Sequence, residues 1–212
     1  REVTIKNTSD SEKLGIAIIY QELNLIPELS VAENIFLHRQ PQRGIFVDWK
    51  QMNSQAADVL KQIDVDIDTK AAVSSLSVAQ QQMVEIAKAV SYHSDVIVFD
   101  EPTSSLTEEE VEHLFRIINM LRDRGCGIIY ISHKMEEILR ISDEVTVMRD
   151  GAWVATEPAA EMTMERIIKL MVGRELTNRF PPKDNEIGGV LLEVEGLTAM
   201  YSKLRDVSFN VH

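Results

Sequence analysis

Two apolar runs, each followed at once by polar residues, predict buried strands of an α/β protein. Residues 15–20 read GIAIIY and residues 96–99 read VIVF, so both are rich in β-branched and aromatic side chains. A third run, GIIYIS at 127–132, follows the turn sequence RGCG. Short apolar runs bounded by turn signals are typical of central strands. We therefore expect these strands to be buried and the last two to be parallel neighbours.

Helical spacing of apolar residues separates these runs. It is present from about 49 to 63, at about 80–92 and after Thr107. The expected core side chains of the last two helices are Met83, Ile86, Ala87, Val90, Val111, Leu114, Phe115, Ile118 and Leu121. Capping boxes that open helices are Ser30 with Glu33 (helix 31–38), Ser77 with Gln80, and Thr107 with Glu110. The chain thus alternates strands and helices, with a helical insertion near 22–93 and a loop at 41–44.

The last third of the chain predicts a hairpin and then a new unit. A short helix at about 135–140 precedes DEVTVMRDGAWVAT, two strands joined at the hairpin signal Asp150-Gly151. A helix at about 163–172 ends at Gly173, and FPPKDNEIGG follows as a linker by composition. Two further strands, in LLEVEGLTAMY and LRDVSFNV, indicate a new unit near residue 190.

Charge and composition narrow the class of protein. The chain has 34 acidic and 22 basic side chains, a formal net charge of -12, and no run of Lys or Arg. This disfavours nucleic acid as a partner, because a phosphate backbone demands clustered positive charge. The lone Cys126 excludes a disulfide framework within the chain and fits a reducing compartment. We expect an intracellular globular protein and, since the sequence starts at Arg1, a piece of a longer one.

Candidate chemistry lies where the strands end. Asp100 and Glu101 directly follow one apolar run, and His133 follows the next. Ligands bind at the carboxyl ends of parallel strands, where one acid can hold Mg²⁺ and its neighbour can orient or deprotonate a water. The alternative is that the acids only open a loop, with Pro102 ending the strand. Ser77 caps a helix, and such an N-terminus also suits an anion.

In chain order, these residues and their surroundings resemble the motifs of an ABC-type ATPase cassette. Gln21 in IIYQE resembles the Q-loop, LSVAQQQ the signature, VIVFDEPTSSL the Walker B and D-loop motifs, and YISHK the switch histidine. YQELNLIPELSVAENIFL, IIYISHKMEEILRISDEVTVMRDG and MVGREL are similar to the ATP-binding subunits of bacterial monosaccharide importers. The galactose/methyl-galactoside type is the most similar, with the ribose, xylose and arabinose types close behind.

The resemblance implies a fold and a domain plan. The fold is α/β, a P-loop NTPase-type ABC cassette that is partial, with a helical subdomain insertion and the opening strands of a second cassette. The implied parts are 1–21 (core strand region to the Q-loop), 22–93 (helical subdomain with the signature), 94–180 (catalytic core), 181–189 (linker) and 190–212 (start of the second cassette).

The resemblance also implies the roles of individual residues toward ATP and Mg²⁺. Gln21 would contact Mg²⁺ or the attacking water, and Asp100 would coordinate Mg²⁺. Glu101 would act on the water, and His133 would bridge to the γ-phosphate. The signature would meet the γ-phosphate of ATP held by the opposite cassette. Its residues are Leu76, Ser77, Val78, Ala79 and Gln80.

The implied partners are a membrane permease subunit, a second ABC cassette of the same chain and, indirectly, a periplasmic sugar-binding protein, but no nucleic acid. The protein would sit peripherally on the cytoplasmic face of the inner membrane. The permease would dock on 22–37, which gives Leu25, Ile26 and Pro27 a purpose if they are exposed. Ordinary core packing is the alternative for each of them.

The sequence departs from the family pattern in three places. Val78 and Ala79 replace the two glycines of the common signature, and Thr107 replaces the usual Asp of the D-loop. Both changes raise the question of whether one of two composite ATP sites is impaired. No G-x-x-x-x-G-K-[ST] phosphate loop occurs. In the family it lies upstream, so we expect a fragment that is inactive alone; the alternative is a divergent cassette that lost the loop.

Two rival functions stay open. One is a non-hydrolysing regulatory or interaction module derived from an ABC cassette. The other is a soluble ABC-type ATPase of DNA repair or chromosome structure, which the acidic balance and the absence of a long coiled coil disfavour.

Overall fold

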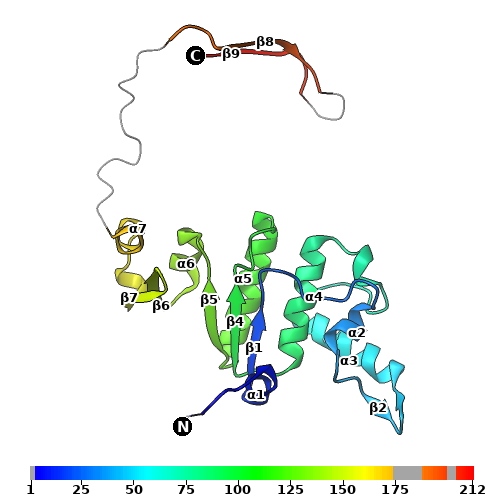
Figure 1. Ribbon diagram of the computed structural model, residues 1–212. Coiled ribbons are helices and arrows are strands. Elements are labelled where there is room, and N and C mark those ends of the chain that lie inside the picture. The colour runs from blue at the N-terminus through cyan, green and yellow to red at the C-terminus, as the bar shows by residue number, and fades with distance from the viewer. Residues whose placement is uncertain (1–2, 174–187, 200–203) are drawn as a thin grey trace. The chain divides into compact units, whose positions relative to one another are not determined.

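The computed structural model describes residues 3–173, 188–199 and 204–212 (Figure 1). The chain divides into two compact units, 1–173 and 174–212. Of the expected linker 181–189, residues 181–187 lie outside the described residues, so the predicted domain boundaries stay predictions. Among the helices that the structure describes, none is both long enough and apolar enough to cross a lipid bilayer.

The first unit is built on a three-stranded parallel sheet. Its order is β1 (Ile16–Ile19), β4 (Val96–Asp100) and β5 (Gly127–Ile131), with β4 in the centre. All three strands run in the same direction, so their carboxyl ends share one edge (Figure 1). The prediction that the last two runs are parallel neighbours is confirmed. The helix between them, α5 (Glu108–Asp123), makes the crossover that parallel pairing needs.

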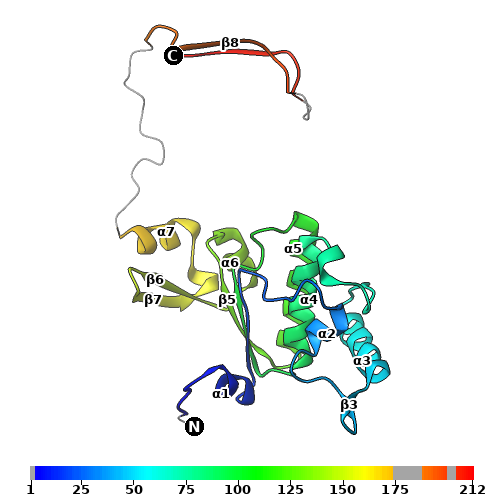
Figure 2. The same cartoon turned by 45° about the vertical axis from the view of Figure 1, so that its right-hand side comes forward.

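The expectation that all three strands are buried was wrong for one face of the sheet. Helices α4 (Val78–Ser91) and α5 lie on the other side (Figure 2), where Ile19, Ile97 and Phe99 are buried. Side chains alternate between the two faces of a strand. Ile18 and Ile129 therefore point away from the helices, and they are 43% and 52% exposed. Two faces of one strand need two covering layers, and these helices supply only one.

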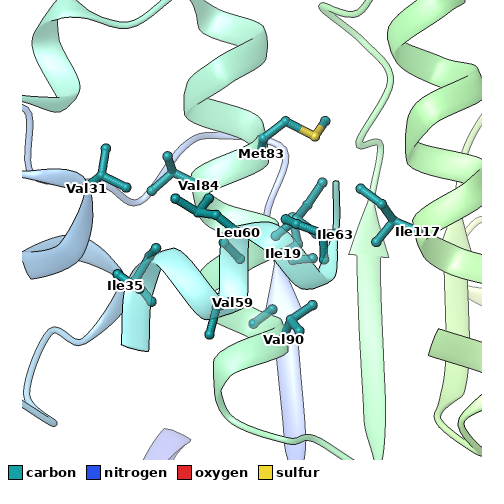
Figure 3. Packing of buried hydrophobic residues seen from close by; sticks show 14 of the residues in the cluster. Ile19, Val31, Ile35, Val59, Leu60, Ile63, Met83, Val84, Val90 and Ile117 are labelled. Atoms are coloured by element: carbon teal, nitrogen blue, oxygen red, sulfur yellow. The ribbon is translucent and has the colours of Figure 1, made fainter. Parts of the chain in front are cut away.

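Three helices pack together beside the sheet. They are α2 (Val31–Ile35), α3 (Trp49–Gln62) and α4, and their apolar side chains meet in the core of Figure 3. The predicted capping boxes of α2 and α4 are both present. Helix α2 ends three residues earlier than predicted. The predicted loop at 41–44 is instead part of a small hairpin of β2 (Gln42–Arg43) and β3 (Phe46–Val47).

Helices α4 and α5 present the predicted apolar stripes to this core. Most of the side chains expected there are buried, and Val111 is half-buried. The buried ones are Met83, Ile86, Ala87, Val90, Leu114, Phe115, Ile118 and Leu121. The Thr107 capping box opens α5 as predicted. Helical spacing therefore identified the buried faces of both helices.

A second, smaller core lies in the last part of the first unit. Helix α6 (Met135–Ile141) precedes the antiparallel strands β6 (Glu144–Arg149) and β7 (Ala152–Pro158), and α7 (Met164–Val172) follows. Asp150 and Gly151 both have positive φ, as the predicted two-residue turn requires. The buried residues of this second core are Val145, Val147, Ala159, Met162 and Ile167.

The structure also has short helices that were not predicted. They are α1 (Thr8–Lys13), Val73–Ser75 and Ala159–Glu161.

The second unit, in its described residues, is an antiparallel pair of strands. These are β8 (Leu192–Leu197) and β9 (Val207–Val211), which lie in the two apolar segments where strands were predicted.

Candidate active site

Strand register brings three of the predicted site residues to one edge of the sheet. One paired row across the sheet consists of Ile19, Phe99 and Tyr130. Two positions beyond this row come Gln21, Glu101 and Ser132, and His133 follows Ser132. Because the strands are parallel, all of these residues lie just beyond the same edge of the sheet, at the carboxyl ends of the strands. The convergence expected from the sequence is therefore present.

Glu101 is the centre of this group. The amide Nε2 of Gln21 donates to Glu101 Oε2 at 3.3 Å. On the other side, Nδ1 of His133 lies 3.2 Å from Glu101 Oε1. The His133 side chain is 66% exposed and that of Glu101 29%, so the carboxylate is held between two partners yet open to solvent. A carboxylate held in this way can accept a proton from a bound water.

The backbone at Glu101 is in a conformation that non-glycine residues rarely adopt. Its φ is 46°, in the left-handed region, directly after the extended strand β4. The Glu101 N–H still donates to the carbonyl of Ile131 at 2.9 Å, which fixes the strained residue against β5. Strain of this kind costs on the order of 1–3 kcal/mol and is concentrated at functional sites. This observation favours a functional role over the alternative of a simple loop opening.

Asp100 is the candidate metal ligand. It is half-buried at the end of β4, and no hydrogen bond or ion pair of its carboxylate occurs within the described ranges. Those residues also contain no cluster of three or more His, Cys, Asp or Glu side chains that could hold a metal. Mg²⁺ commonly takes one or two carboxylates and fills its other positions with water and phosphate oxygens. A free carboxylate beside Glu101 fits that kind of site.

The signature residues form a separate exposed surface at the start of α4. Ser77 N donates to Gln80 Oε1 at 3.0 Å, and Gln80 N donates to Ser77 Oγ at 3.3 Å. Val78 is 53% exposed. Within the described part of the chain, no hydrogen bond or ion pair joins residues 76–80 to Glu101 or its partners. The structure thus groups Gln21, Glu101 and His133 and leaves the signature outside that group.

The segment after Gln21 is held against the helices but keeps part of its apolar surface open. Leu25 packs against the core, whereas Ile26 and Pro27 are exposed. The fully buried Asn34 accepts from Ile26 N at 2.8 Å and donates to Ile26 O at 3.0 Å. Core packing therefore explains Leu25 but not its two neighbours.

Sequence reasoning missed a polar cluster beside His133. Its centre is the Glu137 carboxylate, which accepts hydrogen bonds from three hydroxyl groups and contacts one ammonium group. The donors are Thr103, Tyr130, Ser132 and Lys134. The only signal in the sequence was the crowding of polar residues on both sides of His133. The link from Thr103 to Glu137 spans 34 positions and depends on the pairing of β4 with β5.

A parallel sheet, a strained acid at its carboxyl edge and a capped helix that carries the signature are the features that the resemblance to an ABC cassette implied. The family model described as ABC transporter matches residues 1–104. A nucleotide-free ATP-binding cassette from an ABC transporter superimposes with a TM-score of 0.64 at 21% identity, covering 82% of this chain and 70% of that one. The dimeric ATP-binding cassette MJ0796 bound to ADP and Pi superimposes with a TM-score of 0.63 at 22% identity, covering 73% and 68%. The chain has the ABC cassette fold and carries an ABC transporter domain.

Along its whole length, the chain is similar to sugar import proteins. It is 52% identical over 213 aligned positions to the galactose/methyl galactoside import ATP-binding protein MglA of Shigella boydii serotype 4. The protein of the same name from Escherichia coli strain K12 is also 52% identical. The alignments cover 100% of this chain but only 42% of each relative, so the chain spans less than half of their length.

Proposed function

We propose that the chain forms part of an ATP-hydrolysing subunit that powers monosaccharide import through a membrane permease. The observation that carries this proposal is the Glu101 carboxylate, strained in its backbone and held between Gln21 and His133. The 52% identity to galactose/methyl galactoside import ATP-binding proteins supports the sugar class. This site does not indicate which sugar is imported, because the sugar would pass through the permease and would not contact the ATPase.

In this proposal each group at the carboxyl edge has one task. Glu101 accepts the proton of the attacking water, and His133 donates a hydrogen bond to the γ-phosphate. Gln21 orients the water or contacts the metal, and Asp100 supplies a metal ligand. Mg²⁺, when bound with ATP, would neutralise charge on the phosphate oxygens. The Gln21–Glu101 hydrogen bond and the Glu101–His133 contact support this arrangement, because they hold the carboxylate between its neighbours before nucleotide arrives.

The remaining surfaces suit the partners of such a subunit. Residues 76–80 would meet the γ-phosphate of ATP held by an opposite cassette, and the exposed start of α4 supports that role. The exposed Ile26 and Pro27 would contact the permease, which places the protein peripherally on the cytoplasmic face of the inner membrane. A periplasmic sugar-binding protein would act only indirectly, through the permease. The net charge of -12 supports the expectation that nucleic acid is no partner.

The direct test is Glu101→Gln in the full-length protein that carries this sequence, with Glu136→Gln as the matched control. The amide keeps the size of the side chain but cannot take up a proton, so ATP binding should persist while turnover falls by about 10²-fold or more. Glu136 is exposed on α6 and should tolerate the change. Turnover within a few-fold of wild type would remove Glu101 from this role. A wild-type protein that binds ATP without hydrolysing it would favour the non-hydrolysing module.

A second expectation concerns the 212-residue chain by itself. It has the groups that would surround the γ-phosphate but no G-x-x-x-x-G-K-[ST] loop, whose Lys and backbone N–H groups grip the other phosphates. With a net charge of -12, we expect no measurable ATPase activity and weak nucleotide binding. Isothermal titration with Mg²⁺ and a non-hydrolysable ATP analogue would compare this chain with the full-length protein. Equal affinities would show that other residues grip the phosphates.

A further inference from the structure

The two loops that carry Glu101 and His133 are joined behind the candidate active site by one carboxylate. Glu137 lies in the first turn of α6, and its side chain is only 12% exposed. Its Oε2 accepts from Thr103 Oγ1 at 2.8 Å, which belongs to the loop after Glu101. The same Oε2 accepts from Ser132 Oγ at 3.4 Å, in the loop before α6. One atom therefore contacts both loops.

Lys134 and Tyr130 complete the connection. Lys134 Nζ lies 3.1 Å from Glu137 Oε1 and donates to the carbonyl of Thr103 at 3.0 Å, so it also bridges the two loops. Tyr130 donates its hydroxyl to Glu137 Oε2 at 2.8 Å. Its ring is anchored in the core, with its centroid 6.5 Å from that of Phe99 and 6.1 Å from that of Phe115. The carboxylate is thus linked through Tyr130 to the packed core beside the sheet.

His133 lies between two residues of this cluster. Ser132 Oγ accepts from the Lys134 N–H at 3.0 Å, which closes a tight turn around His133. Ser132 and Lys134 both contact Glu137, so the backbone on each side of His133 is held. Thr103 is 2% exposed and only two positions after Glu101. Glu137 therefore contacts both residues that flank His133 and the residue two positions after Glu101.

Burial by itself would favour the neutral form of Glu137, yet the balance of interactions favours its ionised form. Burial raises the pKa of its carboxyl group, but hydrogen bonds from Tyr130, Thr103 and Lys134 outweigh burial and lower the pKa below its ordinary value. An ionised carboxylate has two acceptor oxygens and no donor, and every neighbour in this cluster is a donor. A glutamine of the same shape has one acceptor oxygen and an NH₂ group that would face a donor. The cluster therefore needs the charge as well as the shape.

We propose that Glu137 is a positioning residue for ATP hydrolysis, which ties loop 101–107 to loop 132–134 so that Glu101 and His133 stay aligned. The inference rests on the proposed function for its catalytic consequence. Misplacing a reacting group by about 1 Å can cost on the order of 10²-fold in rate. A loosened tie should therefore lower kcat and leave ATP binding nearly unchanged, because both oxygens of the Glu137 carboxylate are already occupied by protein partners.

The test compares Glu137→Gln with Glu136→Gln in the full-length protein. Both replace a glutamate on α6 by its amide, but Glu136 is exposed and, in the described residues, makes no side-chain hydrogen bond or ion pair. For Glu137→Gln we expect kcat to fall about tenfold or more, with the KM for ATP within about twofold of wild type. Hydrogen exchange should become faster in peptides covering 101–107 and 131–135. Glu136→Gln should match wild type in both measurements.

A second pair of variants, at Thr103, keeps the proposal testable if Glu137→Gln does not fold. Thr103→Val removes the hydroxyl and keeps the shape, whereas Thr103→Ser keeps the hydroxyl, so only the valine variant should lower kcat. Wild-type kcat in Glu137→Gln, or a raised KM at unchanged kcat, would overturn the positioning role. Unchanged exchange in both loops would overturn the tie itself. A wild-type protein without ATPase activity would instead overturn the proposed function, which the exchange measurement does not depend on.

Discussion

The two faces of the three-stranded sheet are built from similar residues but have different surroundings. On the face toward α4 and α5, Ile97 and Phe99 are 1% and 0% exposed. On the opposite face, Ile18 and Ile129 are 43% and 52% exposed. Isoleucine thus occurs on both, and its chemistry does not distinguish them. The covering layer makes one face a core and leaves the other an apolar surface.

The difference shows which face of the sheet has its packing partners among the described residues. The closed face has helices, caps and an interdigitated core of its own (Figure 3). On the open face, Ile129 and Ile131 line a cavity of about 1070 Å³ that also reaches β6 and α7. The candidate active site lies at the carboxyl edge, where the two faces meet. Its side chains are held by the Gln21–Glu101 hydrogen bond and the Glu101–His133 contact and, in our proposal, by the tie that Glu137 makes between their loops.

The largest expected effect comes from truncating one residue on each face. Phe99→Ala should cost about 3–5 kcal/mol of unfolding free energy, because it leaves a cavity in a packed core. Ile129→Ala should cost about 1 kcal/mol or less, since its side chain is already half in water. Urea unfolding of both variants at one pH would measure the difference. Equal losses would mean that the open face is covered in solution, and the comparison would no longer hold.

A smaller effect is expected from two glutamates, the buried Glu85 and the half-buried Glu137, whose contributions to stability depend on pH in opposite directions. Glu85 lies on α4, and burial raises its pKa above 4.5 despite nearby Lys88 and the N–H of Asn24. Its folded state holds the proton more tightly, so this contribution to stability is full below about pH 4.5 and is lost as pH rises through the folded pKa. The pKa of Glu137 is lowered instead, so its contribution is full above about 4.5 and is lost as pH falls through the folded pKa.

Unfolding free energy measured across acidic to neutral pH would sharpen this contrast. As pH rises from acidic to neutral, Glu85 should lower the unfolding free energy and Glu137 should raise it. Glu85→Gln should therefore remove the decrease, whereas Glu137→Gln should remove the increase. Glu136→Gln, on the exposed side of α6, is the control for the loss of one negative charge. If both variants changed the pH dependence of the unfolding free energy in the same direction, the opposite pKa shifts assigned to Glu85 and Glu137 would be contradicted.

Local features were predictable because their causes lie within a few residues. The capping boxes at Ser30, Ser77 and Thr107 need only a hydroxyl and an acceptor side chain three positions later. The turn at Asp150-Gly151 needs two residues that tolerate positive φ. Helical spacing likewise identified the buried faces of α4 and α5. The motif order also identified Gln21, Glu101 and His133, which the strand register then brought together.

The sequence by itself thus determined the order of the principal elements, the capping boxes of three helices and three members of the candidate site. Tertiary structure alone decided which face of each strand is covered, because alternation places apolar residues on both faces and only α4 and α5 choose between them. It also decided the left-handed backbone of Glu101, which its N–H bond to Ile131 supports across the sheet. The Glu137 cluster was likewise decided by the tertiary structure. Its donors come from separate segments, and they meet only because β4 pairs with β5.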